Sequence, residues 1–175
     1  MDTNTLIGPD LVLMLMGAPT KHEQAIHRIN GITRLEKLLF LADKEAHVQD
    51  NIVDRLSFVA YHYGPYSHAI YKAIELLKEA EFIVEDREID MASVDDIEEV
   101  ITGVYEEGSI ERRFRLTETG LAVAELLGRK FPEVWQGLTA IKERYADLSL
   151  QSLIRYVYTA YPTYAEQSRI RDKVS

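Results

Sequence analysis

Apolar residues recur at helical spacing along most of the chain, and short alternating runs interrupt this pattern. The clearest change of period comes at the turn around Gly64 and Pro65. Residues 56–62, before the turn, are rich in β-branched and aromatic side chains, which predicts a strand. Residues 67–79, after the turn, are predicted to form a helix. The apolar positions that place one face of this helix in the core are Ile70, Ala73, Ile74 and Leu77.

The same helical spacing recurs on both sides of this turn. Thr33 and Glu36 form the pattern of a capping box, in which each side chain bonds the backbone amide of the other residue, so a helix is expected to begin at Thr33. Thr163 and Glu166 repeat this pattern near the C-terminus, and Pro132 suits the first turn of a helix. The predicted helices cover residues 6–16, an exposed stretch over 22–27, residues 33–45, residues 117–128, a segment from Pro132 and a segment from Ser149 that Pro162 ends.

Two short alternating runs, residues 82–89 and 112–116, predict antiparallel strands that form a hairpin. We expect residues 56–62 to pair beside them in one small sheet. This order of helices and strands predicts a mainly α fold with a small antiparallel β-sheet, a winged helix-turn-helix with extra C-terminal helices. Residues 1–130 are expected to form the winged-helix domain, and residues 131–175 a helical extension that packs on it and offers a dimerisation surface.

The segment between the two predicted hairpin strands carries the acidity of the chain. Eleven Asp and Glu residues lie from Glu85 to Glu111, against the single basic residue Arg87. The formal net charge of the whole chain is −9, so the rest of the chain is close to neutral. This acidic insertion in the wing, at about 85–111, is also predicted to contain a short helix. Its apolar residues at helical spacing are Val94, Ile97, Val100 and Ile101.

Composition narrows the classes of function. The 175 residues, 46% of them apolar, suffice for one core, and no apolar run reaches the roughly 18–20 residues of a membrane span. We expect a cytoplasmic protein without a membrane partner. The chain has no cysteines, which excludes disulfides, thiolate metal sites and cysteine catalysis. His22 and His27 lie five residues apart, not the four of a zinc-protease helix, and His62 and His68 have no carboxylate at a defined spacing. We therefore predict no enzyme activity, no metal and no cofactor.

Two segments also resemble a known family. The stretch that begins Gly31-Ile32-Thr33 and continues to residue 42, with the stretch 58–67 that contains the Gly64-Pro65 turn, looks like the paired signature of small prokaryotic proteins of the YwgA-like type. It is more distantly similar to the Panacea antitoxin domain. The resemblance covers residues 31–82, with weaker support from the Leu-Thr-x-x-Gly helix start at Leu116. It implies a winged-helix-like fold, and functions such as transcription regulation, antitoxin action or phage-associated accessory roles.

The first functional hypothesis is a DNA-binding transcription regulator. In a winged helix, the helix after the turn can enter the major groove while the wing lies along the DNA backbone. Here the outer face of that helix is polar and aromatic, and basic residues nearby would contact phosphates. The long acidic wing departs from a typical DNA-reading wing. The predicted nucleic-acid-binding residues are Ser67, His68, Tyr71, Lys72, Arg34, Lys37, Arg112, Arg113 and Arg115.

The second hypothesis is a protein-interaction module, an antitoxin-like or phage-associated adaptor with a basic protein partner. Tyrosine is favoured in binding surfaces, and several tyrosines lie near the turn. The acidic segment would attract positive charge and speed association. The predicted partner-binding residues are Tyr63, Tyr66, Asp95, Asp96, Glu98 and Glu99.

Overall fold

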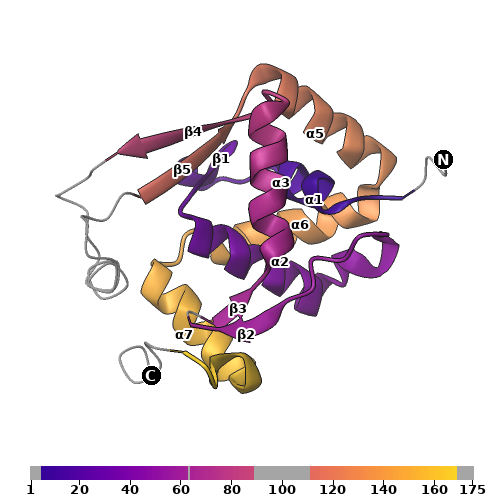
Figure 1. The fold of residues 1–175 in the computed structure, drawn as a ribbon. Coiled ribbons are helices and arrows are strands. Elements are labelled where there is room, and N and C mark those ends of the chain that lie inside the picture. The colour runs from indigo at the N-terminus through magenta and orange to yellow at the C-terminus, as the bar shows by residue number, and fades with distance from the viewer. Residues whose placement is uncertain (1–4, 63, 89–110, 169–175) are drawn as a thin grey trace.

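The computed structural model of the protein describes residues 5–62, 64–88 and 111–168. It is mainly α-helical with a small antiparallel sheet and a separate two-stranded hairpin, which confirms the predicted fold class (Figure 1). The described helices are α1 (Gly8–Gly17), α2 (Ile32–Ala46), α3 (His68–Glu79), α5 (Glu118–Lys130), α6 (Pro132–Tyr145) and α7 (Leu150–Ala160). Short 3₁₀ turns cover Glu23–Ala25, Val48–Asn51 and Pro162–Ala165. The strands are β1 (Arg28–Asn30), β2 (Val59–Tyr61), β3 (Gly64–Tyr66), β4 (Ile83–Glu88) and β5 (Glu111–Leu116).

The wing sheet has the strand order β1-β5-β4, and both of its pairs are antiparallel. The predicted hairpin of β4 and β5 is therefore confirmed, but the expected third strand is wrong. In place of residues 56–62, the short strand β1 pairs with β5, because Ile29 lies opposite Phe114 and both side chains are buried. The sequence α1, β1, α2, α3, β4, β5 is the element order of a winged helix, with the β2–β3 hairpin inserted before α3.

Two predicted helix starts do not have the expected capping. Helix α2 begins after Gly31, which has no side chain to cap it, and the Glu36 carboxylate accepts a hydrogen bond from the distant backbone amide of Ser67 instead of that of Thr33. The second expected capping box lies in the 3₁₀ turn Pro162–Ala165, which has no side-chain cap either. The exposed helix expected over 22–27 is also wrong, since this stretch is a single 3₁₀ turn that leads into β1.

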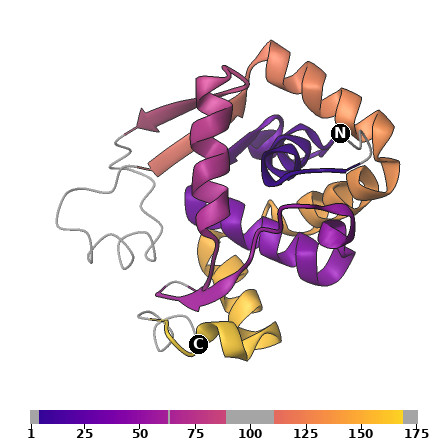
Figure 2. The ribbon, with the colours of Figure 1, turned by 45° about the vertical axis from the view of Figure 1, so that its right-hand side comes forward.

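Helix α1 lies at the centre of the fold. Every residue from Leu11 to Gly17 is buried, so the helix is apolar all round rather than amphipathic. Helices α3, α5 and α6 pack against it, and Figure 2 shows them arranged around it. None of the helices in the described part of the chain is long and apolar enough to cross a membrane.

The two C-terminal helices share this core rather than forming one of their own. Helix α6 packs on α2 and α1, and α7 packs on α2 and β3. Polar contacts reinforce the packing: Glu45 at the end of α2 accepts hydrogen bonds from the hydroxyls of Tyr145 and Tyr156, both at 2.6 Å. Burial and this bond to Glu45 raise the pKa of Tyr145 far above its ordinary value. Together these contacts fix the position of α7 beneath the β2–β3 hairpin.

Candidate functional site

Three tyrosines from three successive elements lie side by side where α3 begins. Tyr61 comes from β2, Tyr66 from β3 and Tyr71 from the first turn of α3. The ring centroids of Tyr61 and Tyr66 are 5.0 Å apart, and those of Tyr66 and Tyr71 are 5.4 Å apart. We call this group the tyrosine cluster. It lies at the hairpin end of α3, and the wing lies at the other end (Figure 1).

The tyrosine cluster is partly exposed to solvent and extends onto neighbouring residues. Tyr61 is 45% exposed, and Val59, on the same strand and face, is 54% exposed. The ring of His62 stacks on Tyr61 at 4.2 Å, and Nδ1 of the exposed His68 lies 3.5 Å from the Tyr66 hydroxyl. Aromatic rings that carry a hydroxyl combine apolar area with hydrogen bonding, which suits them to interfaces that are wet at one edge. The arrangement can therefore bind another protein surface.

Buried polar side chains beneath the hairpin hold the tyrosine cluster in place. Lys37 Nζ donates to the carbonyl oxygen of Pro65 at 3.0 Å, and the backbone amide of Ser67 donates to Oε1 of Glu36 at 3.2 Å. The Ser67 hydroxyl donates to the carbonyl oxygen of Leu56. Burial raises the pKa of Glu36 and lowers that of Lys37 to about 8. Because Glu36 and Lys37 are on α2, these contacts tie the hairpin and the start of α3 to the core.

The turn itself depends on a glycine. Gly64 has a φ of +90°, a conformation that side-chain-bearing residues rarely adopt. A Cβ at this position would also lie 2.6 Å from Cε1 of Tyr158 on α7. The chain can therefore reverse closely against α7, which a two-stranded hairpin needs because it is only marginally stable alone.

Several residues predicted to bind nucleic acid are buried or bonded to other parts of the protein. Ser67 and Lys37 are buried, with 0% and 1% exposure, so the interpretation of Lys37 as a surface cation is wrong. Arg34 Nη1 donates to the carbonyl oxygen of Leu148 at 2.6 Å, which joins α2 to the loop before α7. Of the predicted residues on α3, His68 and Lys72 are exposed and Tyr71 is half-buried.

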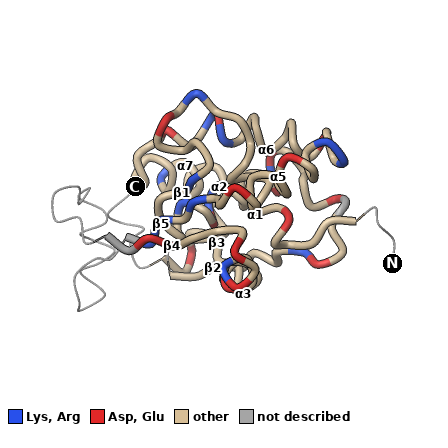
Figure 3. Tube along the Cα trace, turned by 90° about the horizontal axis from the view of Figure 1, so that it is seen from above, with Lys and Arg blue, Asp and Glu red and all other residues tan. Residues whose placement is uncertain are grey.

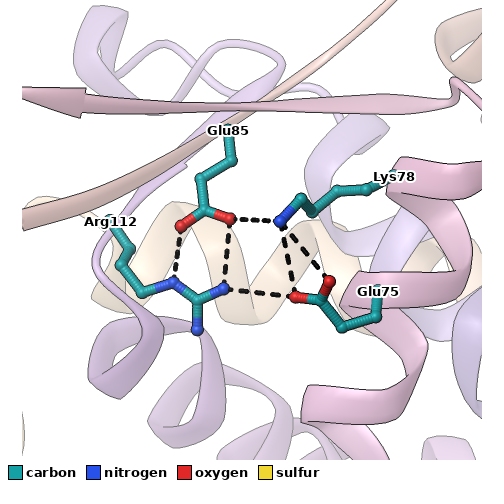
Figure 4. A network of polar contacts seen from close by, with 4 residues as sticks. All are labelled: Glu75, Lys78, Glu85 and Arg112. Carbon is teal, nitrogen blue, oxygen red and sulfur yellow. Dashed lines mark hydrogen bonds and ion pairs between the residues drawn. The ribbon is translucent and has the colours of Figure 1, made fainter.

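The predicted cation Arg112 belongs to a network that joins the wing to α3 (Figure 4). Its Nε and Nη2 donate to both carboxylate oxygens of Glu85, at 2.6 and 3.1 Å, and Lys78 Nζ donates to the same carboxylate at 2.7 Å. Glu75 on α3 completes the network with contacts of 3.4 Å to Lys78 and 3.5 Å to Arg112. The hydrogen bonds from Arg112 hold the pKa of Glu85 at about 2, despite its burial. Arg112 is therefore engaged in a structural interaction.

The other two predicted wing cations lie on the outer face of the sheet. Register places Arg115 opposite Arg28 and Arg113 opposite Asn30, so the three arginines share one face. Arg115 is also paired with Asp86 at 3.2 Å. Figure 3 shows basic residues on β1 and β5, and both acidic and basic residues on α3. The structure thus places these arginines on a different surface from His68, Tyr71 and Lys72.

Two parts of the site were missed at the level of the sequence. Tyr61 belongs to a strand that the sequence predicts in the main sheet. The apolar side chains of Val59 and Tyr61, two residues apart, could have indicated that they share one exposed face of the strand. Arg28 was overlooked because its strand has only three residues. The predicted residues Tyr63, Asp95, Asp96, Glu98 and Glu99, and the predicted helix over 94–101, lie outside the described residues.

Comparison with known proteins gives no match: no protein-family model matches the chain, and no curated protein matches it significantly. The resemblance to YwgA-like proteins therefore stays a prediction, and the function must be argued from the site.

Proposed function

We propose that the protein is a protein-interaction module of winged-helix type that binds its partner through the tyrosine cluster. The observation that carries the proposal is a row of three adjacent tyrosine rings, with Tyr61 exposed and Tyr66 and Tyr71 half-buried, on a support fixed by buried polar contacts. Tyrosines held in place in this way lose little conformational freedom on binding, and tyrosine is enriched among the residues that dominate interface energies.

The overall charge of the chain favours a basic partner. Glu75 lies one helical turn beyond Tyr71, and Glu79 follows on the exposed side of α3. Lys72 is the exposed cation on this stretch of the helix. The net charge of −9 for the whole chain adds a long-range field of the same sign, which speeds association with a positively charged protein.

DNA binding is the second candidate, favoured by the position of α3 in the winged-helix order and by the exposed His68 and Lys72 on it. Two observations weigh against it as the main function. Lys37 and Ser67 are buried, and Arg112 is paired with Glu85, so these groups are not presented to phosphates. The exposed side of α3 also carries Glu79, whose carboxylate would repel phosphate.

Replacing Tyr61 or Tyr71 with alanine should weaken partner binding by about tenfold or more, the loss typical of a central interface tyrosine. Because neither side chain belongs to the main core, the free energy of unfolding should fall by no more than about 1 kcal/mol, of the order of one aromatic pair. The measurement is quantitative co-purification of the tagged protein from its source cell, followed by affinity measurement with the partner recovered.

Leu126→Ala is a matched control, because Leu126 is an exposed apolar residue on α5, away from the tyrosine cluster. A partner that is retained equally by all three variants would refute the proposal. A DNA fragment bound at low micromolar concentration, with affinity lost in Lys72→Ala and unaffected by Tyr61→Ala, would establish the second candidate instead.

A further inference from the structure

A pocket of about 340 Å³ lies beside α2, and no residue of the tyrosine cluster lines it. Its walls come from β1, from the first turns of α2 and from the junction between α6 and α7. The pocket thus lies between the winged-helix elements and the C-terminal helices. Its volume is at the lower end of the range for small-molecule sites, about 300–1,000 Å³.

Three cationic residues from three elements line this pocket: Arg28 from β1, Arg34 from α2 and Lys142 from α6. Lys142 is fully buried, and its Nζ donates to the carbonyl oxygens of Met16 and Ala18 at 2.7 and 2.9 Å. It forms no ion pair with any residue that the structure describes. An ammonium group has three donors, so two carbonyl contacts leave one hydrogen for a further acceptor. A buried cation without a counter-anion is costly, and an anion in the pocket would offset that cost.

The two arginines supply the directional contacts. Nη1 of Arg34 contacts the carbonyl oxygens of Leu148 and Ala146, which both line the pocket, so its guanidinium lies at the wall. Arg28 is exposed and has no ion-pair partner within the described ranges. Planar guanidinium groups bind carboxylate and phosphate oxygens through two parallel hydrogen bonds.

The remaining lining residues are compatible with an anion that has a carbon skeleton. Asp147 is an acidic residue of the lining, and its Oδ1 already accepts a hydrogen bond of 2.7 Å from Nε2 of Gln24. Ile29 and Leu38 supply apolar wall. Three cations against one engaged carboxylate give the pocket a positive charge, although the chain as a whole is acidic.

We propose that this pocket binds a small organic anion with at least two negative charges, held by Arg28 and Arg34 and attracted by the buried charge of Lys142 behind the pocket wall. Such a ligand would join β1 of the wing sheet to the α6–α7 junction. The proposal is independent of the tyrosine cluster, because none of the residues of the cluster lines the pocket.

The test is isothermal titration calorimetry of the full chain with sodium pyrophosphate and with sodium citrate, at ionic strength held constant with sodium chloride. We expect single-site binding of at least one probe. Arg28→Gln should weaken it about tenfold or more, the loss expected for one charge-assisted hydrogen bond. Arg28 is exposed, so this variant should fold, which far-UV circular dichroism checks. The probe that binds more tightly distinguishes a phosphate from a polycarboxylate ligand.

Arg113→Gln is the matched control, because Arg113 lies near Arg28 on the outer sheet face but does not line the pocket. It removes the same charge and should leave the affinity within about twofold, because exposed charges at a distance are screened by salt. The proposal would be overturned if neither probe bound, or if Arg28→Gln bound the probe as tightly as the wild type. An equal loss of affinity in Arg28→Gln and Arg113→Gln would also overturn it, because the anion would then lie on the outer face of the sheet.

Discussion

Replacing Ile74 or Leu77 of α3 with alanine should lower the free energy of unfolding by about 2–5 kcal/mol in each case. Both side chains point into the core, with 0% and 2% exposure. Truncation removes their apolar contacts and leaves a cavity that the surrounding helices can fill only in part. Urea denaturation followed by far-UV circular dichroism measures the loss, and an unchanged slope with denaturant would show that the unfolded state is not affected.

Leu76→Ala is the control for this prediction. Leu76 is adjacent to Leu77 in sequence, but its side chain is 51% exposed, so its removal should change stability by less than about 0.5 kcal/mol. A loss below about 0.5 kcal/mol in both Ile74→Ala and Leu77→Ala would mean that the buried face of α3 is assigned incorrectly. The orientation of α3 matters for function because it also determines where Tyr71 lies relative to Tyr66.

The elements that the sequence predicted well have a local signal at their ends. Helix α5 has Thr117 as its N-cap, which accepts a hydrogen bond of 3.0 Å from the amide of Gly120. Helix α6 begins at Pro132, and Ser149 caps α7 through the amide of Ser152. In each case the capping residue and the apolar stripe lie within one short segment, so no knowledge of distant contacts is needed.

The errors arose where a distant partner decides the structure. Strand β1 has one buried side chain, Ile29, and exists because β5 pairs with it. Glu36 matched a capping box, but its carboxylate bonds the amide of Ser67, which only the tertiary fold brings near. Lys37 was read as a surface charge for the same reason, since its acceptor is the carbonyl oxygen of Pro65. The buried polar contacts that support the tyrosine cluster therefore could not be predicted from the local sequence, whereas the tyrosines near the turn could.

The ion-pair network between the wing and α3 should contribute more to the free energy of unfolding than ion pairs near a protein surface usually do. Glu85→Gln is expected to lower the free energy of unfolding at pH 7 by up to about 3 kcal/mol, because the pKa of Glu85 falls from 4.5 to about 2 on folding. The carboxylate side chain is only 4% exposed, so solvent screens it little. Glu75→Gln is the control: its side chain is 58% exposed, and its loss should cost no more than about 1 kcal/mol.

The stabilisation by Glu85 should depend on pH in a defined direction. A carboxyl group with a depressed pKa in the folded protein binds protons more readily in the unfolded state, so its contribution is fully present above pH 4.5 and is lost as the pH falls towards 2. The difference in stability between the wild type and Glu85→Gln should therefore shrink across this window, and a difference that is constant with pH would contradict the assignment. The same variant also separates the two candidate functions. If Arg112 contacted DNA, its release from Glu85 should strengthen DNA binding, most visibly at low salt, whereas binding of a partner at the tyrosine cluster should stay unchanged.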